Sequence, residues 1–145
     1  MEVYLASAAG LLSWCGKLRK IPTPLAHPTL LAACGADVAL ADSVNRLLYR
    51  QGRISTLPPG VEVLRCWRNQ LLTLSSETNC LTLYDAHDYP LVTSPAGIRP
   101  CDCMVVDCQV IVCGCEDGCL HIFSLPDLRE IAAYPVPGCP MRVAA

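Results

Sequence analysis

The 145-residue chain has few charged residues and no excess of basic ones. Charged side chains make up 17% of the sequence against 52% hydrophobic residues. A disordered chain is excluded, because such chains are rich in charge and cannot bury apolar surface. Eleven Lys and Arg against thirteen Asp and Glu give a net charge of −2. Non-specific nucleic-acid binding needs a basic surplus that displaces counterions from phosphates, so we expect no nucleic-acid partner.

The chain also lacks a convincing secretory signal or membrane anchor. Its apolar opening, residues 1–16, carries Glu2 where a signal peptide has positive charge, and it is too short to cross a bilayer. The eleven cysteines are an odd number, which does not suit a disulfide framework in a chain of this length. We therefore expect a cytoplasmic protein with no membrane partner, whose cysteines are mostly free, buried thiols.

Uninterrupted stretches long enough for ordinary helices are few, because twelve prolines and nine glycines are spread along the chain. Short apolar runs recur instead, bounded by Gly, Pro, Asn, Asp or Ser, which is typical of strands. Two runs follow each other in every unit, and the leucines of the second run lie 36, 34 and 39 residues apart. The first runs begin near Val3, Val38, Leu71 and Val110, and the second near Leu11, Leu47, Leu81 and Leu120.

Each unit continues with a segment that ends in proline and then with a last apolar run that leads to a turn. The last runs are residues 30–35, 61–64, 101–105 and 141–144. Four runs per unit at a period of 34 to 39 residues predict an all-β fold, a β-propeller of about four four-stranded blades. The prediction is one propeller domain or half-domain over residues 1–145, with approximate repeats 1–35, 36–69, 70–107 and 108–145. A helical-repeat solenoid is the alternative.

The repeat resembles the YVTN family of bacterial propellers over nearly the whole chain. The best-matching stretches are residues 71–105 and 110–144, notably GIRPCD at 97–102 and GCPMR at 138–142. The Pro-Asp-Gly turn usual in that family is replaced by VDCQ at 106–109. The resemblance implies that the last run of each unit is the inner strand of the next blade.

The two ends of the chain are complementary under this reading. The inner strand predicted at 141–144 has no following partner, and the strand predicted at 3–7 has no preceding one. Because an unpaired apolar edge promotes association, we expect the two to pair. Pairing within one chain closes a four-bladed ring, and pairing between two chains makes an eight-bladed ring. The chain as part of a longer propeller is the third arrangement left open.

Polar residues on inner strands are the best candidates for a binding site, because these strands line the central channel. Asp102 and Arg142 occupy the same column of adjacent repeats and have opposite charge. They either form an ion pair that seals the axis or hold a small polar or anionic ligand in the Arg fork. Arg99, on the loop before Asp102, and His27, on the loop before another inner strand, are further candidates. His121 lies among apolar residues and reads as a satisfied blade residue.

A cysteine cluster flanks one predicted hairpin, with Cys101 and Cys103 before the turn and Cys113 and Cys115 after it. If Cys103 lies opposite Cys113, the four sulfurs share a face of the sheet and form a zinc site. A register shifted by one residue sends the pairs to opposite faces. The family pattern favours the shifted register, so we predict buried packing and no metal.

Two classes of function follow. The first is a non-enzymatic propeller scaffold that binds a protein or ligand, with a protein partner or a second copy of the chain and no cofactor. The second is a propeller hydrolase, similar to a lactonase, with its site in the central channel. Such an enzyme needs acidic or histidine ligands from several blades. Asp102 is the one acidic residue in the inner-strand column, so the first class is favoured.

Overall fold

The structure is a computed structural model that describes residues 2–7, 10–35, 37–138 and 142–144. These residues form fifteen strands and no helix, which confirms the all-β prediction and rules out the helical solenoid. It follows that no helix in the described ranges is long and apolar enough to cross a membrane. The chain divides into two compact units, Met1–Leu57 and Pro58–Ala145.

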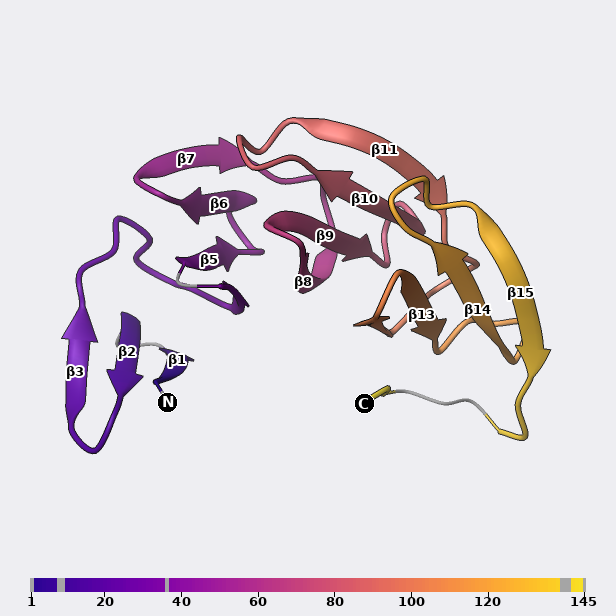
Figure 1. The fold of residues 1–145 in the computed structure, drawn as a ribbon, viewed down its shortest axis with the longest axis horizontal. Helices are drawn as coiled ribbons and strands as arrows, with labels where there is room; N and C mark the ends of the chain where they lie inside the picture. Colours follow the sequence, from indigo (N-terminus) through magenta and orange to yellow (C-terminus); the bar gives the residue numbers. More distant parts are fainter. Residues whose placement is uncertain (1, 8–9, 36, 139–141, 145) are drawn as a thin grey trace. The chain divides into compact units, whose positions relative to one another are not determined.

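The first unit contains two antiparallel sheets in which neighbours along the chain are also neighbours in the sheet (Figure 1). The first sheet has three strands and the second has four. Their strands are β1 (Val3–Ser7), β2 (Gly10–Trp14) and β3 (Leu18–Ile21), then β4 (Leu30–Cys34), β5 (Asp37–Asp42), β6 (Leu47–Arg50) and β7 (Arg53–Thr56).

The second unit contains two four-stranded sheets with the same meander topology (Figure 1). The first of these is β8 (Val61–Trp67), β9 (Gln70–Ser75), β10 (Cys80–Tyr84) and β11 (Pro90–Pro95). The other is β12 (Asp102–Val106), β13 (Gln109–Cys113), β14 (Cys119–Ser124) and β15 (Glu130–Pro135).

The observed strands follow the predicted repeat. The runs predicted near Val3, Leu11, Val38, Leu47 and their counterparts in the second unit all lie in strands. The proline-ended segments match β3, β7, β11 and β15, each of which ends at or just before a repeat proline. Proline fits there because it has no N–H to donate to the ladder of hydrogen bonds. Three of the last runs become β4, β8 and β12, the first strand of each four-stranded sheet, which we call the inner strand.

The fourth inner strand was predicted at residues 141–144, and this prediction is wrong for the residues that the structure describes. Residues 142–144 form no strand, and Met141 lies outside the described residues. The first sheet accordingly has three strands, in the order β1-β2-β3, with β1 at its edge. None of the sheets formed by the described residues includes residues 142–144, so the closing strand predicted at 141–144 is not formed there.

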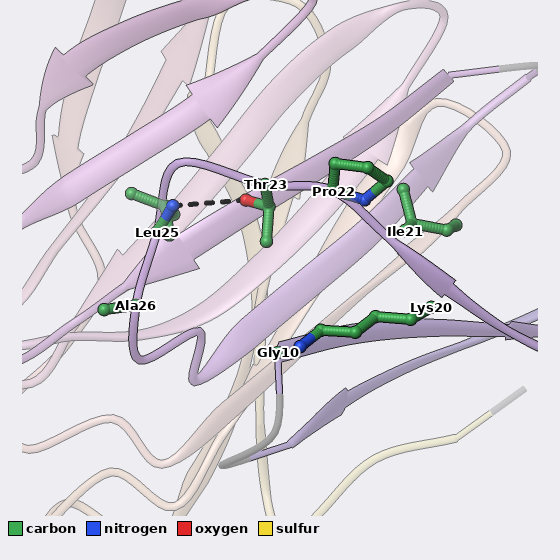
Figure 2. A pocket seen from close by; sticks show the side chains of 7 residues that line it. All are labelled: Gly10, Lys20, Ile21, Pro22, Thr23, Leu25 and Ala26. Carbon is green, nitrogen blue, oxygen red and sulfur yellow. Dashed lines mark hydrogen bonds between the residues drawn. The ribbon is translucent and has the colours of Figure 1, made fainter.

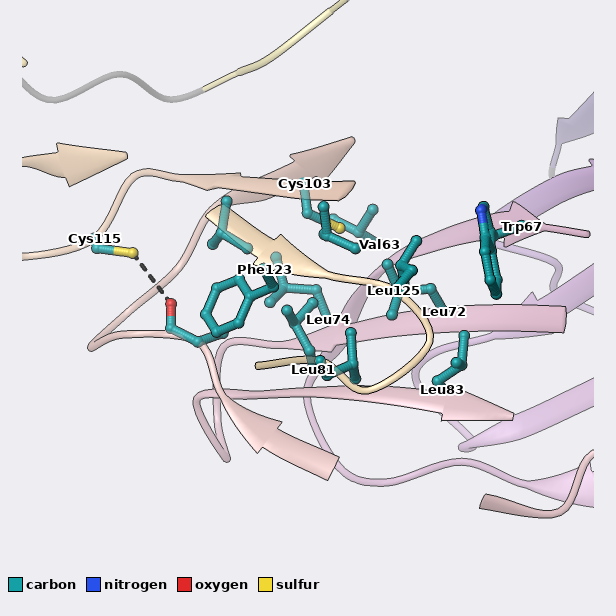
Figure 3. Close-up of a cluster of buried hydrophobic side chains, with 14 residues drawn as sticks. Val63, Trp67, Leu72, Leu74, Leu81, Leu83, Cys103, Cys115, Phe123 and Leu125 are labelled. Atoms are coloured by element: carbon teal, nitrogen blue, oxygen red, sulfur yellow. Dashed lines mark hydrogen bonds between the residues drawn. The ribbon is translucent and has the colours of Figure 1, made fainter. Parts of the chain in front are cut away.

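The core of the second unit joins its two sheets. Leu72 and Leu74 of β9 pair with Leu83 and Leu81 of β10, so all four side chains lie on one face. They belong to a cluster of fourteen buried residues that also contains Phe123 of β14 (Figure 3). Each fully buried Leu or Phe contributes about 1.5–3 kcal/mol of transfer free energy. This cluster holds β12 and the loop after β13 in place.

The first unit has a smaller apolar cluster. Leu11, Leu25 and Leu40 are buried together, and Tyr4 and Tyr49 are among the half-buried residues that pack against them. Leu11 comes from the three-stranded sheet, Leu40 from the four-stranded sheet, and Leu25 from the segment that joins the two. The connection between β3 and β4 is therefore part of the core of this unit.

Candidate functional site

The inner strand β12 carries a buried carboxylate whose hydrogen-bonding capacity is used within the protein. Asp102 is 6% exposed, and its Oδ1 accepts the N–H of Cys103 at 2.9 Å and lies 3.3 Å from Nη2 of Arg65. Its Oδ2 accepts the N–H of Val143 at 3.1 Å. A buried carboxylate is stable only when it is paired and hydrogen-bonded in this way.

Arg65 links two inner strands. It lies on β8, and its Nε donates to the carbonyl oxygen of Cys103 on β12 at 3.0 Å, while the same guanidinium pairs with Asp102. The sequence analysis did not single out Arg65, although a lone Arg within the apolar run 61–67 is a signal for a partner on a neighbouring strand. The Arg65–Asp102 ion pair and the hydrogen bond to Cys103 connect the two adjacent sheets.

Arg142 was predicted to pair with Asp102 across the channel mouth. The structure gives Asp102 the guanidinium of Arg65 and, from the segment that carries Arg142, the N–H of Val143. Arg142 also contributes to the electrostatic surroundings of Cys113, where burial is the main cause of a raised thiol pKa and the Arg142 charge opposes it. The segment that carries Arg142 therefore contacts Asp102 through the N–H of Val143, and Arg65 supplies the positive charge beside the Asp102 carboxylate.

Arg99 and His27 are the other two residues that the sequence analysis proposed for ligand binding. The Arg99 guanidinium is paired with Glu116 at 3.1 Å, with both side chains at least half exposed. The backbone N–H of Arg99 donates to Oδ1 of Asn79 at 2.9 Å. His27 is exposed on the connection between β3 and β4 of the first unit. Both remain candidates for ligand contact.

The cysteine hairpin adopts the shifted register. Cys103 lies opposite Val112, and Cys113 lies opposite Asp102, so the two Cys-x-Cys pairs do not share a face and the four-sulfur zinc site is excluded. Cys103 is fully buried with Val110 and Val112, and burial raises its pKa to about 12. The predicted packing role is confirmed for Cys103.

Eight of the cysteines in the described residues are free thiols, as expected for most of them, but only Cys103, Cys113 and Cys115 are buried, so the prediction that most are buried is wrong. Cys34 and Cys66 are the exceptions, since each is disulfide-bonded. The free thiols are Cys15, Cys80, Cys101, Cys103, Cys108, Cys113, Cys115 and Cys119.

The first unit contains a cavity of about 300 Å³ beside β2 and β3 (Figure 2). Lys20 supplies its one charged side chain, and Thr23 Oγ1 accepts the N–H of Leu25 at 3.2 Å across one wall. The sequence analysis missed this cavity because the repeat pattern locates strands along the chain and does not show how the connection after β3 folds against β2 and β3. Its lining residues are Gly10, Lys20, Ile21, Pro22, Thr23, Leu25 and Ala26.

Comparison with known proteins supports the fold and no specific activity. No family model and no curated protein sequence matches the chain, so the resemblance to the YVTN family remains a prediction. The chain is similar in structure to the computationally designed protein Ika8, with a TM-score of 0.78 and 11% identity over 99% of this chain and 49% of that one.

Two further proteins are similar to a comparable degree. The WD40 repeats of RRP9 give a TM-score of 0.70 and 14% identity over 92% of this chain and 47% of that one. A catalytically inactive virginiamycin B lyase from Staphylococcus aureus, solved with quinupristin, gives 0.68 and 15% over 94% and 53%. The chain spans about half the length of these three proteins. WD40 repeats build β-propellers, and the four sheets of this chain have the propeller-blade fold.

Proposed function

We propose that the protein is a non-enzymatic propeller scaffold that binds a second copy of its own chain through the outer edge of its first sheet, at β1. The observation that carries this proposal is the three-stranded first sheet. By the repeat, β1, β2 and β3 correspond to the second, third and fourth strands of the other sheets, so the position next to β1 is that of an inner strand.

The edge of β1 has the chemistry of a pairing surface. β1 is hydrogen-bonded to β2 on one side and has no other strand beside it in its sheet, within the residues that the structure describes. Val3 and Leu5, which point to the same face, are 42% and 45% exposed. An apolar strand at the edge of a sheet is a template for another strand.

The inner strands favour a scaffold over a channel hydrolase. Glu62 and Asp102 are the acidic residues of β4, β8 and β12, and Asp102 is already held by Arg65 and two N–H groups. A metal-dependent hydrolase needs several carboxylates or histidines that are free to converge on one ion. Metal-dependent hydrolysis of a lactone that is lost in Asp102→Asn would favour the hydrolase instead.

The test is the mass of the purified 145-residue chain across a concentration series, measured by analytical ultracentrifugation. We expect a concentration-dependent dimer. Leu5→Lys places a charge on the proposed edge and should weaken self-association about tenfold or more, equivalent to about 1.4 kcal/mol. Leu18→Lys is the matched control, because Leu18 is 58% exposed on β3, at the opposite edge of the same sheet.

Each outcome decides the proposal. A dimer weakened by Leu5→Lys and left intact by Leu18→Lys supports it. A monomer at all concentrations, or equal effects of the two variants, overturns it. Circular dichroism of both variants checks that the sheets are still formed.

A further inference from the structure

The turn between β13 and β14 and the first half of β14 bring three different metal-binding groups together. The Sγ of Cys115, a carboxylate oxygen of Asp117 and a ring nitrogen of His121 all lie within 4.8 Å of one another. Zn²⁺ binds thiolate at about 2.3 Å and imidazole or carboxylate at about 2.0–2.2 Å, so ligand atoms around one ion lie about 3–4 Å apart. The three groups need only a small adjustment to reach that spacing.

The orientation of His121 is the one that metal-binding histidines have. Its Nε2 lies 2.7 Å from Oδ2 of Asp117, and its Nδ1 lies 2.5 Å from Oε1 of Glu130. A histidine that binds a metal through one ring nitrogen almost always donates the other N–H to a carboxylate, which fixes the tautomer and the ring. Glu130, at the start of β15, supplies that carboxylate.

The other two groups are also held in place. Oδ1 of Asp117 accepts the N–H of Cys119 at 2.9 Å, which leaves Oδ2 toward His121. Cys115 is buried, and its Sγ lies 3.4 Å from the carbonyl oxygen of Ala96. The site is therefore reached from solvent through Asp117, whose side chain is half exposed.

A glycine keeps space beside the two buried ligand atoms. A Cβ at Gly97 would lie 2.8 Å from the Sγ of Cys115 and 3.5 Å from Nε2 of His121, and the backbone there has a φ of +91°. The main chain before β12 thus approaches the site closely without filling it. The backbone at Gly97 therefore forms one side of the space around Sγ and Nε2, and it belongs to a different segment from the turn that carries the ligands.

We propose that Cys115, Asp117 and His121 form a zinc site, with the fourth position open to water and Glu130 as the positioning residue for His121. Thiolate and carboxylate together balance the charge of the divalent ion.

The test uses Co²⁺ as a spectroscopic substitute for zinc. Metal-free protein is titrated with Co²⁺, and we expect one equivalent to give a thiolate-to-cobalt charge-transfer band and the visible spectrum of a four-coordinate ion. Zn²⁺ should then remove both signals. Absence of binding, or cobalt spectra without the thiolate band, overturns the proposal and leaves the three side chains as an ion network within the blade.

Variants assign the ligands. Asp117→Asn, at a half-exposed position, and Cys115→Ser should each abolish stoichiometric binding, and Glu130→Gln should lower zinc affinity about 10–100-fold. Cys108→Ser is the matched control, since Cys108 is an exposed thiol in the turn between β12 and β13 of the same sheet. Binding that survives Asp117→Asn, or that is lost equally in Cys108→Ser, contradicts the assignment. Circular dichroism of each metal-free variant shows whether lost binding reflects a lost fold.

Discussion

The two units contain the same blade pattern, but the first sheet of the first unit is less buried than the other sheets. In the second unit, fourteen buried residues from both four-stranded sheets form one cluster. In the first unit, the four-stranded sheet is also buried, at Ala39, Leu40, Ala41 and Leu48, and Leu11 of the three-stranded sheet packs with Leu25 and Leu40. Large apolar side chains of the first sheet are instead exposed, among them Leu5, Trp14 and Leu18.

The strand count accounts for much of this difference. In a four-stranded blade the second and third strands are covered on both edges, and Leu72, Leu74, Leu81 and Leu83 of β9 and β10 are all fully buried. In the three-stranded sheet the equivalent of the second strand is β1, which is an edge, and none of its residues is buried. An inner strand thus determines how much of the following strand is buried.

The largest expected effect is on the core of the second unit. Leu74→Ala should lower the free energy of unfolding by about 2–5 kcal/mol, because it removes buried methyl groups and leaves a cavity. Leu18→Ala, the same change at a 58% exposed position of the first sheet, should cost no more than about 0.5 kcal/mol. Urea unfolding of both variants measures the contrast. A large cost for Leu18→Ala would mean that the first sheet is covered in solution and that the comparison between the units fails.

A smaller difference between the units is expected where the backbone of the second unit is tightly packed. Gly114 has a φ of +80°, and a Cβ there would lie 2.4 Å from the Cβ of Cys101. Gly52 in the first unit has a φ of +76° and open space around the same position. We expect Gly52→Ala to lower the free energy of unfolding by about 1–2 kcal/mol, because alanine is strained in the left-handed region. Gly114→Ala has the same strain, and overpacking against Cys101 should lower the free energy of unfolding by about 1–3 kcal/mol more. Thermal unfolding compares the two, and equal costs would contradict the packing difference.

The strands were predictable from the sequence because a period-2 pattern and turn residues recur in each unit. The register of the cysteine hairpin was also predictable, since it is the one that buries Cys103 with Val110 and Val112. The partner of Asp102 was not, because the repeat aligns positions along the chain and does not say which side chain reaches across from β8. The set of Cys115, Asp117 and His121 was missed for a similar reason. The three residues are unevenly spaced along the chain, and only the conformation of the turn brings their side chains together.

The smallest expected effect concerns a single turn of the first unit and its dependence on pH. Asp42 ends β5, and its carboxylate accepts the N–H of Asn45 at 3.0 Å and the side-chain amide of Asn45 at 2.7 Å. These hydrogen bonds hold the pKa of Asp42 below its ordinary value of 3.8, against the opposing effect of burial. A carboxyl group whose pKa is lower in the folded state stabilises the fold above its unfolded pKa and loses that contribution as the pH falls through the folded pKa.

Asp42→Asn removes this contribution, so the difference in unfolding free energy between the parent protein and the variant should be constant near neutral pH and shrink below about pH 4. Urea unfolding of both proteins at several pH values between about 3 and 7 measures it. Because the turn belongs to the first unit, the effect should appear in the stability of β5 and β6, which hydrogen exchange of their amides resolves from the second unit. A difference that stays constant down to about pH 3 would mean that the Asn45 hydrogen bonds do not favour the ionised carboxylate, and that this turn is held by its backbone alone.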